Sequence, residues 1–235
     1  KEAKEASVIA LDLMGNPSSV HKKGRASRYF IEKARKKVAS LVGMEADNII
    51  FTSGATEANN IALLNSKVFT SAIEHESVTE QLEISYIKTD KLGYMCLDDL
   101  NFKLPEYIGA KENNNNPIVS MMLANNETGI IQPVNKVAEI AHKYGAKFHC
   151  DAVQAAGRIQ IDMKKLDCDM MTLSSHKIGG PKGAGALVFN SSSLLNPIFR
   201  GGGQERNFRS GTEPIISIVG FGVAADHAQN LPLSK

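Results

Sequence analysis

The sequence predicts an α/β domain built around a largely parallel sheet. Short apolar runs typical of buried strands alternate along the chain with stretches in which apolar residues recur at helical spacing. No internal repeat and no linker divides the chain, and 43% hydrophobic with 22% charged residues is a globular rather than a disordered composition. Its 235 residues suit one large domain, or one domain with a fragment of a second.

The first residues already show a helical pattern, so the chain is expected to begin within a helix. Over 22–42, apolar residues fall at helical spacing opposite a face of Lys and Arg, which predicts a second helix. The apolar run 49–51 predicts a short buried strand, and EANNIALL after it predicts a helix. Further strands are predicted at 68–72, 85–88, 118–124, 147–151 and 169–174, further helices at 133–144 and 213–228, and a polar Asn-rich loop at 111–117.

Composition and charge exclude several functional classes. The formal net charge of +2 gives no electrostatic case for binding nucleic acid or a membrane surface. No apolar run reaches the roughly 18 residues of a membrane span, and the first apolar stretch is too interrupted for a signal peptide. Three scattered cysteines, Cys96, Cys150 and Cys168, are too few for a disulfide framework or a zinc site. We therefore expect free thiols, no metal centre and a cytoplasmic location.

The segment TSGATE lies between a predicted strand and a predicted helix. A helix N-terminus has unpaired N–H groups and the positive end of the helix dipole, which together favour a phosphate. Gly54 lets the backbone approach a ligand closely, and the Thr56 hydroxyl adds a donor. The alternative is ordinary helix capping by Ser53 or Thr56, with Glu57 in the first turn.

Two polar clusters follow the ends of later strands. Asp151 in FHCDAVQ offers a carboxylate for a protonated ligand nitrogen, with Gln154 as a hydrogen-bonding neighbour; the alternative for Asp151 is a helix N-cap. Lys177 in SSHKIGGPKG would lie at the mouth of the sheet, where open α/β folds bind ligands. A lysine there can act as a Schiff-base nucleophile and proton carrier, whereas the alternative is a solvated loop lysine, with Lys182 as a competitor.

Two further residues stay ambiguous when each is taken alone. His75 in SAIEHESV is either a stacking partner for a planar ligand or a satisfied core histidine, and Asn126 in ANNETG is either a turn residue or an amide that contacts a ring. The set decides between these alternatives. A phosphate cradle, an acid for a ring nitrogen, a stacking histidine and a lysine at a strand end are the parts that a pyridoxal 5′-phosphate site needs.

Seven blocks of sequence carry a family resemblance. GNPSSVHKKGR, IIFTSGATEANN, EHESV, ANNETGIIQPV, CDAVQAAGRIQID, SSHKIGGPKGAGAL and GGGQERNFRSGTEP resemble, in this order, the class V aminotransferases, and within them the NifS/IscS-type cysteine desulfurases. The resemblance implies the large domain of a fold type I (aspartate aminotransferase-like) pyridoxal-phosphate-dependent transferase over 21–228. Residues 1–20 would be an N-terminal segment that lacks the start of the family domain, and 229–235 the connection to a largely absent small domain.

The resemblance also implies a role for each motif residue. Lys177 matches the lysine that binds the cofactor covalently, Asp151 the acid that pairs with the pyridine nitrogen, and His75 the histidine that stacks on the ring and assists proton transfer. Gln154 matches the partner of the ring hydroxyl, and Asn126 matches a residue near the ring and the substrate carboxylate. The remaining matches contact the phosphate or the Schiff-base region: Ala55, Thr56, Ser174, His176 and Thr212, the last of these across a homodimer.

The activity implied is conversion of L-cysteine to L-alanine, with the sulfur passed as a persulfide to an acceptor protein, either an iron–sulfur scaffold or a tRNA-thiolation relay. Three departures accompany the resemblance. The N-terminal strand motif is absent, the stretch between EANNIALL and EHESV is short, and no cysteine stands in the context of the persulfide-forming one. The alternatives are a selenocysteine lyase, another class V aminotransferase, or an inactive remnant that serves as a binding module. Loss of a small domain would also leave an apolar surface uncovered.

Overall fold

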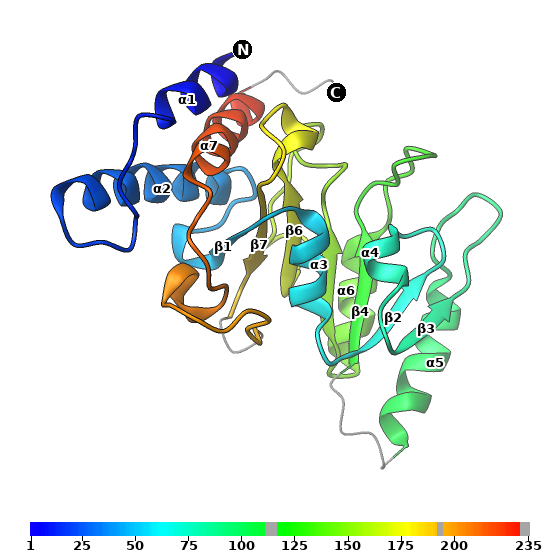
Figure 1. Ribbon diagram of the computed structural model, residues 1–235. Helices are drawn as coiled ribbons and strands as arrows, with labels where there is room; N and C mark the ends of the chain where they lie inside the picture. Colours follow the sequence, from blue (N-terminus) through cyan, green and yellow to red (C-terminus); the bar gives the residue numbers. More distant parts are fainter. Residues whose placement is uncertain (111–116, 192–194, 231–235) are drawn as a thin grey trace.

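A seven-stranded sheet forms the centre of the molecule, in the order β1-β7-β6-β5-β4-β2-β3 (Figure 1). The computed structural model describes residues 1–110, 117–191 and 195–230, so most of the expected loop at 111–117 and of the segment 229–235 lies outside the described residues. Every strand runs parallel to its neighbours except β7, which is antiparallel to both β1 and β6. The strands are β1 (Ile49–Thr52), β2 (Lys67–Ser71), β3 (Ile84–Ile87), β4 (Pro117–Met122), β5 (Lys147–Asp151), β6 (Met170–Ser174) and β7 (Gly185–Phe189).

Helices cover both faces of this sheet, because successive strand residues point to opposite sides. In β2, Phe69 packs into a core with α2, α5, α6 and α7, whereas its neighbour Val68 packs into a second core with α3 and α4. Figure 1 shows α3 and α4 together on the near face of the sheet. The helices are α1 (Glu2–Ala10), α2 (Lys22–Ser40), α3 (Ala55–Leu63), α4 (Glu76–Thr79), α5 (Leu97–Gly109), α6 (Val134–Lys143) and α7 (Ile215–Asn230).

The predicted α/β class with a mostly parallel sheet is confirmed, and each predicted strand is found within about two residues of its expected position. Three of these elements were not predicted: the four-residue helix α4, the helix α5 and the strand β7. The helix α5 contains Pro105, which weakens its helical signal, and β7 begins at Gly185, the last residue of the glycine-rich stretch 179–185. Since β7 is antiparallel, it returns the chain between β1 and β6 and gives the sheet its mixed character.

The carboxyl ends of the parallel strands meet at one edge of the sheet, which is where open α/β folds bind ligands. At this edge β7 begins directly beside the turn that follows β1. A Cβ atom added to Gly185 would lie 2.5 Å from the carbonyl carbon of Gly54, so only glycine allows the two backbones to approach this closely. The glycine-rich segment thus brings the turn after β1 and the residues after β6 to the same place.

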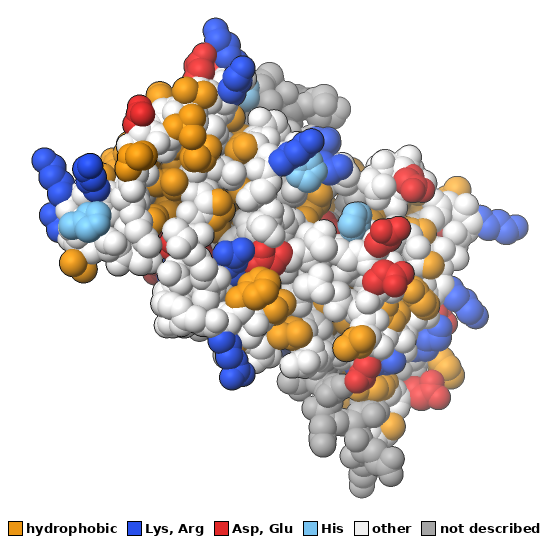
Figure 2. Space-filling view, viewed as in Figure 1, with side chains coloured by type: hydrophobic (Ala, Val, Ile, Leu, Met, Phe, Trp, Pro, Cys, Tyr) orange, Lys and Arg blue, Asp and Glu red, His pale blue; other side chains and the backbone are white. Residues whose placement is uncertain are grey.

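Hydrophobic side chains gather where α1, α2 and α7 meet (Figure 2), and they line a groove of about 140 Å³. Its lining includes Ile9 and Leu13 from the N-terminal segment, Phe30 from α2 and Val219 from α7. An uncovered apolar surface was expected for a large domain without its small domain. Within the described part of the chain, no helix is both long enough and apolar enough to span a membrane.

Candidate active site

One cavity of about 540 Å³ opens at the carboxyl edge of the sheet. Nine of the ten site residues predicted from the sequence line it, and the tenth, Thr212, does not. These nine come from the carboxyl ends of β5 and β6 and from the segments that follow β1, β2, β4, β5 and β6, which lie far apart in the sequence. They are Ala55, Thr56, His75, Asn126, Asp151, Gln154, Ser174, His176 and Lys177.

The first turn of α3 forms one end of the cavity. Gly54 is the N-cap residue, and no side chain caps the helix, so the alternative of capping by the side chain of Ser53 or Thr56 is not what the structure shows. A Cβ atom added to Gly54 would meet no heavy atom within 4 Å, which leaves open space beside the backbone. Because the first N–H groups of a helix have no partner within the helix, this end of the cavity can hold an anion.

Asp151 ends β5 and is buried within the cavity wall. Its Oδ2 accepts a hydrogen bond of 2.9 Å from Asn59 Nδ2, and its Oδ1 accepts one of 3.0 Å from the backbone N–H of Val153. Burial raises the pKa of Asp151, although the hydrogen bonds from Asn59 and Val153 oppose this shift. A buried carboxyl whose partners are neutral donors is suited to a ligand that carries a positive charge.

A second carboxyl group, Glu74, lies near Asp151 and was not predicted to belong to the site. It is buried, and its Oε1 accepts a hydrogen bond of 2.8 Å from the backbone N–H of Met122, at the end of β4. Its Oε2 is buried and has no partner in the structure. Burial and the charge of Asp151 raise the pKa of Glu74 well above its ordinary value, because an ionised second carboxylate here would be repelled.

His75 follows Glu74 and is exposed at the cavity, so the interpretation of a satisfied core histidine is wrong. It is the N-cap residue of α4, and its Nδ1 accepts a hydrogen bond of 3.1 Å from the backbone N–H of Ser77. Since Nδ1 accepts this bond, the neutral ring carries its proton on Nε2. The Ser77 hydroxyl also accepts a hydrogen bond of 2.8 Å from Asn59, which connects His75 to the partner of Asp151.

In the turn after β4, two adjacent asparagines have separate tasks. The side chain of Asn125 is buried and holds the turn: its Oδ1 accepts hydrogen bonds from the backbone N–H groups of Glu127 and Thr128, and its Nδ2 donates to the carbonyl of Ile73. Asn126 is exposed and lines the cavity. Asn125 is therefore the residue that forms the turn, and the amide of Asn126 is left for the cavity.

The segment after β6 supplies the basic side of the cavity. Lys177 and Lys182 both line it, and Lys177 is exposed there rather than enclosed. His176 Nδ1 lies 3.0 Å from the Ser174 hydroxyl. Burial lowers the pKa of His176, and the charges of the two lysines lower it further, so its imidazole is neutral at physiological pH.

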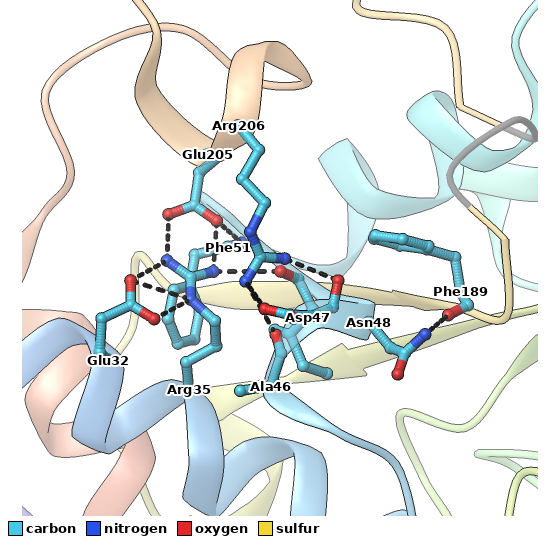
Figure 3. Close-up of polar contacts among 10 residues, drawn as sticks. Glu32, Arg35, Ala46, Asp47, Asn48, Phe51, Phe189, Glu205 and Arg206 are labelled. Atoms are coloured by element: carbon cyan, nitrogen blue, oxygen red, sulfur yellow. Dashed lines mark hydrogen bonds and ion pairs between the residues drawn. The ribbon is translucent and has the colours of Figure 1, made fainter.

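Thr212 is exposed and lies outside this cavity, in an open depression of about 560 Å³ formed by the glycine-rich segment 199–213. A buried ion pair holds this segment against β1, and Figure 3 shows its carboxylate and guanidinium groups facing each other. Arg35 Nη1 lies 2.6 Å from Glu205 Oε2, and Arg35 Nη2 lies 2.8 Å from Glu205 Oε1. Burial alone lowers the pKa of Arg35, but the hydrogen bonds and charge of Glu205 outweigh it and raise the pKa.

Both partners of this pair also bind the backbone of β1. Arg35 Nη1 donates to the Ile49 carbonyl at 3.1 Å, and Glu205 Oε2 accepts from the Phe51 N–H at 2.7 Å. The backbone of Glu205 has a φ of 44°, in the left-handed region that non-glycine residues rarely adopt, and Arg206 and Asn207 continue in it. Charged contacts on both sides of the turn compensate for this strain, because Arg206 binds the Asp47 carboxylate at 2.8 Å just before β1 (Figure 3).

Sequence reasoning missed three buried polar residues of the site: Ser77, which lines the cavity, and Asn59 and Glu74, which do not. Asn59 lies on the buried face of α3, and a polar residue at an otherwise apolar helical position was the signal available for it. Among the chain's three cysteines, Cys150 and Cys168 are buried and Cys96 is half-buried; all three are free thiols, and none is among the residues that line the cavity.

Comparison with known proteins connects this geometry to one family. The family model described as Aminotransferase class-V matches residues 5–235. A curated cysteine desulfurase IscS from Dictyoglomus turgidum is 40% identical over 231 residues, which cover 91% of this chain and 57% of that protein. A cysteine desulfurase from Enterobacter agglomerans is 42% identical over 92% of this chain and 56% of its own length. The chain thus spans little more than half the length of these relatives.

Solved structures agree with the curated relatives. The NifS-like protein from Rickettsia africae superposes with a TM-score of 0.89 and 37% identity, over 97% of this chain and 65% of that one. A structure described as SspA in complex with cysteine has a TM-score of 0.85 and 31% identity, over 97% of this chain and 69% of that one. The resemblance found in the sequence motifs is confirmed, and the chain belongs to the class V aminotransferase family.

Proposed function

We propose that this chain binds pyridoxal 5′-phosphate in the cavity at the carboxyl edge of the sheet, as part of an enzyme that removes sulfur from L-cysteine. The convergence of nine residues of complementary chemistry on one cavity carries the proposal. An uncapped helix N-terminus lies at one end, a buried carboxyl group in the wall and a lysine on the basic side. When bound, the cofactor supplies an electron sink for negative charge on the carbon next to the substrate's amino group.

The residues present fit this cofactor. The space beside Gly54 and the free N–H groups of the first turn of α3 suit a phosphate, with the hydroxyl of Thr56 as a further donor. Asp151 would pair with the protonated pyridine nitrogen. This nitrogen would supply the positively charged partner that the buried carboxyl group does not have among its hydrogen-bond donors, Asn59 and Val153. Gln154 would hydrogen-bond the ring hydroxyl, and Ser174 and His176 would contact the phosphate side of the cavity.

Two residues of this chain would handle protons. Lys177 would hold the cofactor covalently and, once displaced by the substrate's amine, move a proton at the substrate's α-carbon. His75 would lie on the ring, and its Nε2 proton is the one available to the substrate because Nδ1 is occupied by Ser77. Asn126 would orient the substrate carboxylate from the turn that Asn125 holds in place.

The substrate and partners follow from the relatives. Curated relatives are cysteine desulfurases, and SspA was solved in complex with cysteine, so we propose L-cysteine as the substrate and L-alanine as the product. The sulfur would pass as a persulfide to an acceptor protein in the cytoplasm, either an iron–sulfur scaffold or a tRNA-thiolation relay. The position of Thr212 outside the cavity of its own chain supports a homodimer in which Thr212 contacts the partner's cofactor.

One observation favours a second candidate function. Sulfur transfer requires a thiol at the cavity, and none of the three cysteines is among the described residues that line it. This favours a chain that binds the cofactor and activates an amino acid but does not itself accept sulfur. In an assay of sulfide and alanine release from cysteine, we expect little turnover by these 235 residues alone; rapid turnover would contradict this second candidate.

Cofactor binding is tested by absorbance and by chemical trapping. Protein mixed with pyridoxal 5′-phosphate should acquire the visible or near-ultraviolet band of a lysine-bound cofactor, and borohydride should fix the label on the peptide that contains Lys177. Lys177→Ala should abolish both signals. Lys182→Ala is the matched control, since Lys182 lines the same cavity, and it should retain both. Labelling of Lys182 with an intact band in Lys177→Ala would overturn the assignment.

A further inference from the structure

An ion pair lies directly behind the proposed phosphate end of the cavity. Arg209 Nε is 2.7 Å from Glu57 Oε1, and Arg209 Nη2 is 3.3 Å from Glu57 Oε2. Glu57 belongs to the first turn of α3, and its Oε2 also accepts a hydrogen bond of 2.7 Å from the backbone N–H of Ser53. One carboxylate therefore joins the turn 53–56 to the glycine-rich segment 199–213.

Arg209 reaches this position because its segment is held in place. Glu205 ties the segment to β1 from one side, and the guanidinium of Arg209 lies over the ring of Phe199, 5.7 Å from its centroid. The side chains of Arg209 and Glu57 are only 18% and 10% exposed, so solvent screens their interaction less than it screens a surface pair. Neither residue lines the cavity, so neither would touch a ligand bound there.

Glu57 poses an electrostatic problem for a phosphate site. Its carboxylate occupies the same helix N-terminus that would bind the phosphate, and the two negative groups repel each other through a partly desolvated region. Burial raises the pKa of Glu57, but the hydrogen bonds from Arg209 and Ser53 outweigh it, so the net shift is downward and the group is ionised. The positive charge of Arg209 offsets the negative charge of Glu57, and so reduces the repulsion between Glu57 and a phosphate dianion bound at this helix N-terminus.

We propose that Arg209 and Glu57 are positioning residues for the cofactor phosphate: Glu57 orients the turn 53–56 through Ser53, and Arg209 cancels the negative charge that Glu57 places beside the phosphate. This inference rests on the proposed function, since it requires pyridoxal 5′-phosphate in the cavity. It assigns the segment 199–213 a role within its own chain, in addition to the one proposed for Thr212.

Two experimental properties distinguish this role from that of an ion pair that only holds the two segments together. Substitution of either partner breaks the same ion pair, so a structural tie predicts equal effects of Arg209→Met and Glu57→Gln. The proposed role predicts unequal effects, because only Arg209→Met leaves an unpaired carboxylate beside the phosphate, while the glutamine amide oxygen in Glu57→Gln still accepts from Ser53. The second property is phosphate dependence: pyridoxal, which lacks the phosphate, should be insensitive to the pair.

The experiment is a titration of the wild-type chain and three variants with pyridoxal 5′-phosphate and, separately, with pyridoxal, followed by the absorbance of the bound cofactor. We expect Arg209→Met to weaken pyridoxal 5′-phosphate binding by about tenfold or more, and pyridoxal binding by less than about twofold. Glu57→Gln should weaken the phosphate form by less than about threefold. The double variant Arg209→Met/Glu57→Gln should recover most of the loss of Arg209→Met.

Arg206→Met is the matched control, because Arg206 pairs with the exposed Asp47 on the same segment and does not touch the turn 53–56. It should bind both ligands as the wild type does. Equal losses in Arg209→Met and Glu57→Gln, or a loss for pyridoxal as large as for the phosphate form, would overturn the inference while leaving cofactor binding intact. A wild-type chain without a band for either ligand would instead overturn the proposed function, and this inference with it.

Discussion

The two sides of the cavity differ in how they accommodate their carboxyl groups. On the side of β1, Glu57 is paired with Arg209 and Glu205 with Arg35, at distances below 3 Å. On the side of β2 and β5, Glu74 and Asp151 accept hydrogen bonds from neutral groups, namely backbone N–H groups and the amide of Asn59. Glu57 and Glu205 are thus neutralised within the chain, whereas Glu74 and Asp151 have no hydrogen-bonded cation.

This difference matches the two ends of the proposed ligand. A pyridine ring that carries a proton on its nitrogen is positive at one end, whereas its phosphate is negative at the other. Asp151 offers a counter-charge to the nitrogen, and at the other end the charge of Glu57, in the first turn of α3, is offset by Arg209. Substitution of an arginine on the side of β1, or of a residue that contacts a carboxyl group on the side of β2 and β5, changes how these charges are balanced. The following variants therefore test this explanation.

The largest effect is expected from Arg35→Met. It leaves Glu205 buried without its cation, and truncation of one partner of a buried pair costs about 3–5 kcal/mol in the free energy of unfolding. Urea unfolding followed by circular dichroism measures this cost. The double variant Arg35→Met/Glu205→Gln should recover part of it, because no charge then remains buried. A single variant as stable as the wild type would show that Arg35 does not compensate for the charge of Glu205.

A smaller effect is expected on the other side from Asn59→Ala. This change removes the amide that donates to Asp151 and to Ser77, and an unsatisfied buried acceptor costs about 1–3 kcal/mol. Urea unfolding again gives the stability, and a cofactor titration shows whether Asp151 still supports binding. Asn60→Ala is the control, because Asn60 is exposed and its side chain bonds to the carbonyl of Thr56 and to Gln81, and not to Asp151 or Ser77. Equal losses in both variants would exclude a specific role for Asn59.

Glu74→Gln tests the unpaired acids through pH. A carboxyl group whose pKa is raised in the folded state binds its proton more tightly when folded, so its contribution to stability is present at low pH. That contribution is lost as the pH rises above the unfolded pKa of about 4.5 toward the raised folded value.

The wild type should therefore lose stability over this range, with a slope of at most about 1.4 kcal/mol per pH unit from Glu74. Glu74→Gln keeps the acceptor for Met122 and should give a shallower profile in urea unfolding at a series of pH values. Glu76→Gln, an exposed substitution in the same turn, should leave the profile unchanged. An unchanged slope in Glu74→Gln would mean that Glu74 is ionised in the folded protein.

The smallest effect is expected from Asp47→Asn. The Asp47 side chain is 94% exposed, and exposed ion pairs contribute about 0.2–1 kcal/mol that salt screens further. Stability should therefore change by less than about 1 kcal/mol, although Arg206, the partner of Asp47, is the residue next to Glu205. A cost comparable with that of Arg35→Met would show that contact geometry, and not burial, decides what these pairs contribute.

The fold could be predicted where the local sequence alone indicates that a segment is buried. The apolar runs at β1, β4, β5 and β6 are buried on both faces, so composition alone revealed them. The strand β7 was missed because it begins at Gly185, a glycine required by the close approach to Gly54, which lies more than 100 positions away in the sequence. The helix α5 was missed because Pro105 interrupts a pattern that the core residues Leu100 and Leu104 otherwise support.

The site residues likewise fall into those that could be predicted from the local sequence and those that could not. Residues at strand ends, such as Asp151 and Lys177, could be predicted because the edge of a parallel sheet brings such positions together whatever the details of packing. Asn59 and Glu74 could not, because their roles depend on partners across the fold, Asp151 for one and Met122 for the other. The role of a buried polar side chain depends on the residue that it contacts in the folded structure, and its local sequence does not identify that residue.

The contacts of Arg35 and Glu205 with β1 have a consequence for solubility. Within the described residues, β1 is the last strand of the sheet and has a neighbour on one side only, and an open strand edge is a template on which another polypeptide can add a strand. The Ile49 carbonyl and the Phe51 N–H are two of the groups that an incoming strand would need, and both are already bonded to side chains. The buried ion pair therefore protects the end of the sheet against edge-to-edge aggregation, so its loss would expose the chain to self-association as well as to unfolding.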